Sequence, residues 1–186
     1  LLISFPTIMT AYPAIDGVSG ATPLAILRDG GSVPLTTLFL GTHSGTIGET
    51  SVLAILIGAA YLIIKRVINP RIPLCVIGSA AVFVVLFGLG KGAAVDVNYV
   101  ATHLMGGGLL AGAVFMATDY VTAPVTKWGQ VIYAVLIGFL TAFIRTCGGS
   151  TEGMSYAIII SNLLTPLIEK WTAPKPFGLE HKEASK

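Results

Sequence analysis

Five long apolar segments constrain this chain more than any other feature of its sequence. They cover residues 50–68, 72–89, 99–117, 130–146 and 154–168. A helix needs about 20 mostly apolar residues to cross a hydrocarbon layer roughly 30 Å thick, and each segment approaches that length. Because backbone groups inside a bilayer must bond within the protein, such segments fold as helices. The sequence therefore predicts an all-α membrane protein, a bundle of about five transmembrane helices.

The composition agrees with this class. Hydrophobic residues make up 54% of the 186 residues and charged residues only 11%, whereas about 25% of a soluble domain is charged. The net charge of +2 indicates no nucleic-acid partner. Two cysteines, Cys75 and Cys147, are too few and too far apart to hold an iron–sulfur cluster. We expect both to be buried thiols in or near helices.

Two stretches depart from the regular apolar pattern. The third segment contains Gly106, Gly107, Gly108 and Gly112, which predicts a broken or closely packed helix. Such an interruption is tolerated at membrane depth only where protein or a cavity covers it. Glycine, threonine and proline punctuate the stretch 32–46, which we expect to dip into the interface without crossing.

The basic residues predict an orientation. If the loop ahead of the first segment lies outside, five crossings put eight basic residues inside and three outside. The inner set is Lys65, Arg66, Arg71, Lys127, Lys170, Lys175, Lys182 and Lys186, and the outer set is Arg28, Lys91 and Arg145. The positive-inside rule therefore favours this arrangement, with the carboxy terminus in the cytoplasm. Trp128 and Trp171 then fall beside the cytoplasmic ends, where aromatic belts lie.

The outer loop contains the sequence DGVSGATPL at residues 16–24. Its glycines and proline keep the backbone open around Thr22, so that a bulky group could approach the hydroxyl. The same residues make a good helix start, with Thr22 as the N-cap and Pro23 as the first helical residue. The pattern alone leaves both interpretations open.

This motif resembles the flavinylation motif of membrane subunits that carry FMN on a threonine through a phosphoester bond. Further motifs follow in the order expected of that family: GTIGE at 45–49, FMATDYVTAP at 115–124 and GGSTEGMSY at 148–156. The chain resembles most the D subunit of the Rnf complex, an ion-translocating ferredoxin:NAD oxidoreductase, because of TAPVTK at 122–127 followed by Gly129 and Gln130. It is less similar to the B subunit of the sodium-translocating NADH:quinone reductase.

The resemblance implies a covalent FMN on Thr22, relaying electrons between ferredoxin and NAD with coupled sodium or proton translocation. It implies that Asp16 and Ser19 serve the flavin transferase. Amides of Gly20 and Ala21, with the following helix N-terminus, would stabilise the phosphodiester. The implied partners are the other membrane and peripheral subunits of an Rnf-type complex, in a bacterial cytoplasmic membrane.

The family also carries helices ahead of the flavin motif, whereas this chain begins at Leu1. We therefore expect the carboxy-terminal half of the family pattern, one half of an inverted-repeat architecture. A second flavin, riboflavin, would belong to the full-length protein. The predicted regions are an extracytoplasmic flavin-attachment loop region at 1–49, a transmembrane bundle at 50–171 and a cytoplasmic tail at 172–186.

Several other polar residues are candidates for function. Glu49 and Asp119 could line an ion path, or they could be a first-turn acid and a turn acid. Arg145 could neutralise a flavin phosphate or pair with Glu152 across a glycine-rich turn. Asn162, inside the last segment, needs a partner on a neighbouring helix.

Two histidines, His43 and His103, raise the possibility of haem or a metal. Neither lies in a recognisable ligand pattern, so we expect packing or loop roles and no metal. The chain also contains no nucleotide-binding fingerprint. It is therefore not a complete enzyme alone, and the donor and acceptor sites would lie on partners.

Three alternatives stay open at this point. The chain could serve the quinone reductase, which changes only the electron acceptor. It could be a channel or transporter-like bundle with no redox role, in which the third segment and Glu49 line a pore. It could also be a truncated, non-functional fragment.

Overall fold

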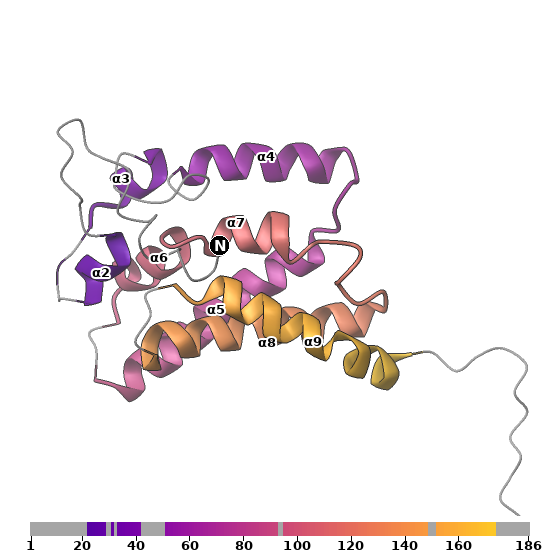
Figure 1. Ribbon diagram of the computed structural model, residues 1–186. Coiled ribbons are helices and arrows are strands. Elements are labelled where there is room, and N and C mark those ends of the chain that lie inside the picture. Colours follow the sequence, from indigo (N-terminus) through magenta and orange to yellow (C-terminus); the bar gives the residue numbers. More distant parts are fainter. Residues whose placement is uncertain are drawn as a thin grey trace, which may run out of the picture.

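The protein is all-helical throughout the part of the chain that the computed structural model describes, which is residues 22–28, 31, 33–41, 51–92, 95–148 and 152–173 (Figure 1). The helices are α2 (Pro23–Arg28), α3 (Leu35–Leu40), α4 (Val52–Ile64), α5 (Arg71–Gly90), α6 (Val97–Met105), α7 (Leu109–Ala111), the π-helix η1 (Gly112–Met116), α8 (Lys127–Cys147) and α9 (Met154–Thr172). Those ranges contain no strand. The expected all-α class is confirmed.

All five predicted segments are helical, but they differ in length. The helices α5 and α8 are long and apolar enough to cross a membrane, and α6 with α7–η1 would make a third span bent by 58°. The thirteen-residue α4 is shorter than its predicted segment because the chain turns at Lys65 and Arg66, where Arg66 takes a left-handed φ of 56°. The nineteen-residue α9 ends in polar residues. By length and apolarity, the described residues therefore contain two or three spans, fewer than the predicted five.

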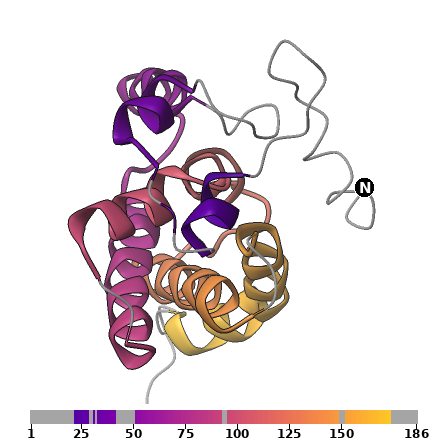
Figure 2. The ribbon, with the colours of Figure 1, turned by 90° about the vertical axis from the view of Figure 1, so that its left-hand side faces the viewer.

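The core at the centre of the molecule is formed by α5, α8 and α9 together with α7–η1 (Figures 1 and 2). The helices α5 and α8 run parallel, because Arg71 Nη1 donates to Gln130 Oε1 (3.2 Å) at their first turns and Lys91 Nζ donates to the Thr146 carbonyl at their last. The helix α9 runs antiparallel to α8. We name the two ends of the bundle the Arg71 end and the Arg145 end.

Polar contacts join α8 to its neighbours inside the core. Tyr133 Oη donates to Asn162 Oδ1 at 2.5 Å, which confirms the interhelical partner predicted for Asn162. The predicted burial of the cysteines is wrong for Cys147, which lies exposed at the last residue of α8, and Cys75 is only half-buried. Cys147 is exposed because α8 ends at this residue, where the chain leaves the bundle.

The helices α5 and α8 approach each other closely at Gly138. A Cβ on this glycine would lie 2.0 Å from Ser79 Oγ and 2.7 Å from the Ala80 backbone nitrogen. We expect Gly138→Ala to destabilise the bundle by about 1–3 kcal/mol, the usual cost of overpacking. The matched change Gly78→Ala meets nothing within 4 Å and should stabilise α5 by about 0.5–1 kcal/mol.

Thermal unfolding of the two variants in detergent checks this prediction. A melting temperature below the wild type for Gly138→Ala and at or above it for Gly78→Ala is the expected pair of results. Equal melting temperatures would mean that the two helices can separate at Gly138 without cost.

Candidate functional site

The third span breaks at consecutive glycines, as the sequence predicts. Gly107 and Gly108 have φ angles of 66° and 64°, in the left-handed region that other residues rarely adopt. The helix α6 ends just before them, and the chain resumes as α7 and η1 in a new direction. The break at Gly106–Gly108 is the feature around which the site is built.

The helix α6 lies across the Arg145 end of the bundle. Near its start, the Tyr99 ring comes within 3.3 Å of where a Cβ on Gly88 would lie, close to the end of α5. Near its finish, the His103 carbonyl meets Arg145 in the last turn of α8. Because α5 and α8 are parallel, both contacts lie at one level of the bundle. The helix α6 therefore does not run along the bundle, and only α7–η1 runs back toward the Arg71 end.

Arg145 donates hydrogen bonds to backbone carbonyls on both sides of Gly106, the first residue of the break. Its side chain is only 8% exposed, and its Nη1 and Nη2 donate to the carbonyls of His103 and Gly107. These carbonyls belong to the last turn of α6 and to the break, where a continuous helix would have satisfied them with its own amides. A forked guanidinium suits this task because it donates in two directions from one rigid plane. Arg145 therefore replaces the hydrogen bonds that the break removes.

The helix α2 packs against the break through Leu24, beside Arg145, and Figure 2 shows α2 close to α6. It starts as predicted, with the half-buried Thr22 as the residue before Pro23 and the Thr22 carbonyl accepting from Ile26 N at 3.0 Å. Leu24 is 4% exposed. Its Cδ1 lies 2.3 Å and its Cγ 3.5 Å from where Cβ atoms on Gly107 and Gly106 would be. Only glycine permits this contact. Leu24 therefore lies directly on the break, and Thr22 is two residues before Leu24 in the chain.

Two side chains of opposite charge, Glu152 and Arg145, both lie close to Gly107. Glu152 Oε1 lies 2.7 Å and Arg145 Nη2 lies 2.9 Å from where a Cβ on Gly107 would be. The ion-pair alternative for Arg145 and Glu152 stays a prediction, because both distances are measured to that Cβ position and not between the charged groups. Contact of Arg145 with a flavin phosphate stays a prediction, since the guanidinium already serves two carbonyls.

Asp119 lies at the Arg71 end, away from Thr22. Its Oδ1 accepts from Val121 N at 3.4 Å, and its Oδ2 accepts from Thr122 Oγ1 at 3.1 Å. This is the geometry of an acid that closes a turn. A role for Asp119 in an ion path stays a prediction.

His103 is buried and packs its ring on Tyr99, with ring centroids 4.6 Å apart. Within the described ranges, no three His, Cys, Asp or Glu side chains gather as metal ligands would. The remaining predicted residues lie outside the described ranges, and these are Asp16, Ser19, Gly20, Ala21, His43 and Glu49.

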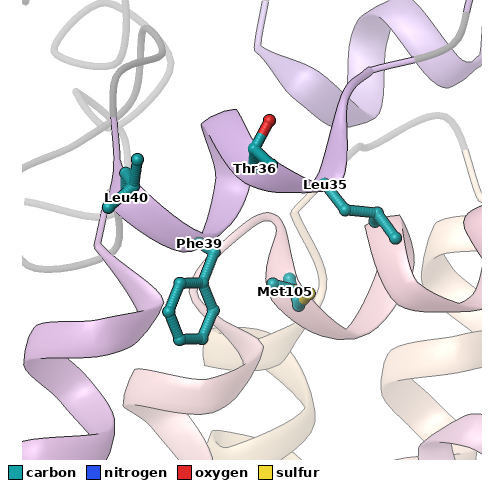
Figure 3. A pocket seen from close by; sticks show the side chains of 5 residues that line it. All are labelled: Leu35, Thr36, Phe39, Leu40 and Met105. Carbon is teal, nitrogen blue, oxygen red and sulfur yellow. The ribbon is translucent and has the colours of Figure 1, made fainter.

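An apolar hollow adjoins the break (Figure 3). It has a volume of about 440 Å³ and is lined by Leu35, Thr36, Phe39, Leu40 and Met105. Met105 is the last residue of α6, and the other four come from α3. The described part of the stretch 32–46 thus forms a six-residue helix that does not cross the bilayer, as predicted.

The sequence pointed to the glycines, to Thr22 and to Arg145 separately, and did not connect them. Leu24 was not predicted as a site residue, nor were the carbonyls of His103 and Gly107. One signal was present, namely a single arginine inside an otherwise apolar segment, which must find polar partners within the protein. Which partners it finds depends on the position of α6, which no local pattern specifies.

The fold and this site define a helical membrane protein whose broken helix is pinned at one end of its bundle. A family profile described as NQR2, RnfD, RnfE matches residues 1–178, and the chain belongs to this family.

Named relatives agree with this membership. The chain is 46% identical to the D subunit of the Na⁺-translocating ferredoxin:NAD⁺ oxidoreductase complex of Acetobacterium woodii, over 96% of this chain and 56% of the relative. It is 42% identical to the D subunit of the proton-translocating ferredoxin:NAD⁺ oxidoreductase complex of Clostridium ljungdahlii, over 96% and 58%. It is 39% identical to the B subunit of the Na⁺-translocating NADH-quinone reductase of Azotobacter vinelandii, over 85% and 42%. The chain spans about half the length of these relatives.

Proposed function

We propose that this chain is part of a membrane subunit of an Rnf-type complex and carries covalent FMN on Thr22. In that role it relays electrons between ferredoxin and NAD, coupled to the translocation of sodium or protons. The supporting observation is the position of Thr22 at the start of α2, which Leu24 seats on the break. Family membership and the names of two relatives support the complex.

The residues at Thr22 fit a phosphoester-linked flavin. The threonine is only half-buried, so a bulky group has room, and Pro23 and Leu24 hold the following helix in place. FMN, when bound, supplies a centre that accepts and passes on electrons. The protein's contribution is to fix the attachment point at the Arg145 end. Ferredoxin and NAD would bind to partner subunits.

The intact mass of the chain, purified with its flavin transferase co-expressed, tests the flavin. We expect an addition of one FMN less one water, together with a fluorescent band in a denaturing gel. The transferase is shown to be active on a second substrate in the same cells. An unmodified chain under those conditions would contradict the proposal and favour the channel or fragment alternatives.

We further propose that the Arg145 end faces outward in a bacterial cytoplasmic membrane. Among the described basic residues, Lys65, Arg66, Arg71, Lys127 and Lys170 belong to the predicted inner set. The exposed Trp128 and Trp171 accompany them at the Arg71 end.

Native Cys147 tests this orientation, because it is exposed at the Arg145 end. A membrane-impermeant maleimide should label it in intact cells, and Cys147→Ser should remove the label. In that serine background, Tyr120→Cys at the Arg71 end, where Tyr120 is 90% exposed, should react only after permeabilisation. The reverse pattern would invert the topology.

The quinone reductase is the second candidate, favoured by the relative from Azotobacter vinelandii. It differs in the electron acceptor, so the assembled complex should be assayed with ferredoxin and NAD and, separately, with NADH and a quinone. Turnover with quinone alone would replace the first proposal. The relatives from Acetobacterium woodii and Clostridium ljungdahlii are named for different ions, so family membership leaves the coupling ion open.

A further inference from the structure

We propose that Arg145 is a positioning residue for Thr22, acting through the Gly106–Gly108 break and Leu24. This inference rests on the proposed function only for the biological purpose of the positioning. The contacts that position residue 22 do not involve a flavin. No single motif contains this connection, because its parts come from three separate regions of the sequence: Thr22 with Leu24, the Gly106–Gly108 break, and Arg145.

The first step is the link from Arg145 to the break. The guanidinium donates to carbonyls 42 and 38 residues earlier in the chain, one on each side of Gly106. It therefore fixes the end of α6 and the first residues of the break relative to α8, the helix with the most extensive packing in the core. Because the arginine is 8% exposed, water does not compete strongly for these bonds.

The second step is the link from the break to α2. Leu24 occupies the space that a side chain at residue 107 would need, and Arg145 Nη2 borders that same space at 2.9 Å. The leucine thus packs into a surface whose shape Arg145 maintains. The helix α2 has six residues, too short to hold its position by its own hydrogen bonds. Its position therefore depends on this buried leucine.

The third step is the link from α2 to Thr22. The Thr22 carbonyl accepts the first hydrogen bond of α2, so residue 22 moves with that helix. A flavin on Thr22 would be attached at a residue that is linked to α8 by the contacts of Leu24, Gly107 and Arg145. Loss of Arg145 would free the attachment point while leaving its hydroxyl in place.

The test places a nitroxide spin label at residue 22 of the full-length chain in its complex, and so needs no flavin. Thr22→Cys is labelled in a background of Cys75→Ser and Cys147→Ser. Arg145→Lys keeps the positive charge but loses the fork, and Leu24→Ala removes the packing without altering the buried charge. Lys91→Gln is the control, because Lys91 also donates to a backbone carbonyl at this end but is exposed.

We expect an immobilised label in the background and in Lys91→Gln. In Arg145→Lys and Leu24→Ala the label should become mobile, so that its spectrum narrows relative to the background. A label that stays immobilised in folded Arg145→Lys or in folded Leu24→Ala, or that is already mobile in the background, would overturn the proposal. If Arg145→Lys does not fold, Leu24→Ala decides alone.

The mass measurement on Thr22 distinguishes the two proposals. An unmodified threonine together with an immobilised label would remove the flavin and leave the positioning role intact. A flavinylated threonine with a label insensitive to Leu24→Ala would do the opposite.

Discussion

Thr22→Ala is expected to remove the covalent flavin completely and to abolish ferredoxin:NAD turnover together with the coupled ion transport. The reason is chemical, since no other atom at residue 22 can form the phosphoester. The variant should still fold, because the cap bond of α2 comes from the backbone carbonyl, which alanine retains. The loss of the side-chain hydroxyl at an N-cap costs about 0.5–2 kcal/mol, which a bundle can tolerate.

Two controls make the result specific to the hydroxyl of residue 22. Thr22→Ser retains a hydroxyl and should retain some covalent flavin and turnover. Thr36→Ala alters an exposed threonine on α3 and should change neither. The measurements are intact mass, in-gel fluorescence and turnover of the reconstituted complex. Full ion transport by Thr22→Ala would favour a pore without a redox role.

Gly107→Ala is expected to be strongly destabilising, because strain and overpacking act at the same residue. A non-glycine residue in the left-handed region costs about 1–2 kcal/mol. In addition, the new Cβ would lie 2.3 Å from Leu24 Cδ1 and within 3 Å of Glu152 Oε1 and Arg145 Nη2. Overpacking of this kind adds about 1–3 kcal/mol. The whole site at the Arg145 end should loosen as a result.

Gly92→Ala is the matched control for backbone strain. Its φ of 69° is close to the 66° of Gly107, yet a Cβ there meets nothing within 4 Å. Thermal unfolding should therefore show a small loss for Gly92→Ala and a larger one for Gly107→Ala. If the two losses are equal, strain alone accounts for the glycine, and the packing of Leu24 on the break has no energetic weight.

Local patterns predicted the local features of this protein. Apolar length predicted the helices, the run of glycines predicted the broken third span, and Thr22 followed by Pro23 predicted a helix start. Asn162 was expected to find a partner on another helix, and Tyr133 is that partner. In each case the residue type restricts the backbone or the hydrogen bonding directly.

The relations between distant segments were not predictable in this way. Apolarity is the same for a helix that crosses the bundle and for one that lies over its end, so the position of α6 was missed. The early end of α4 depends on Arg66 taking a left-handed conformation that favours glycine, which the residue type argued against. The partners of Arg145 and the contact of Leu24 depend on the position of α6 and of the break that follows it.

The parallel course of α5 and α8 has a consequence for the membrane's electrical profile. The chain must return between them, and the returning helix, Leu109–Met116, is only about 12 Å long against about 30 Å for the twenty residues of α5. Backbone that is not helical at membrane depth must be covered by protein or by water. Where water supplies that cover, the transmembrane voltage falls over a shorter distance beside η1 than along α5. A charge carried across that short stretch would exchange about 2.3 kcal/mol with the field for every 100 mV.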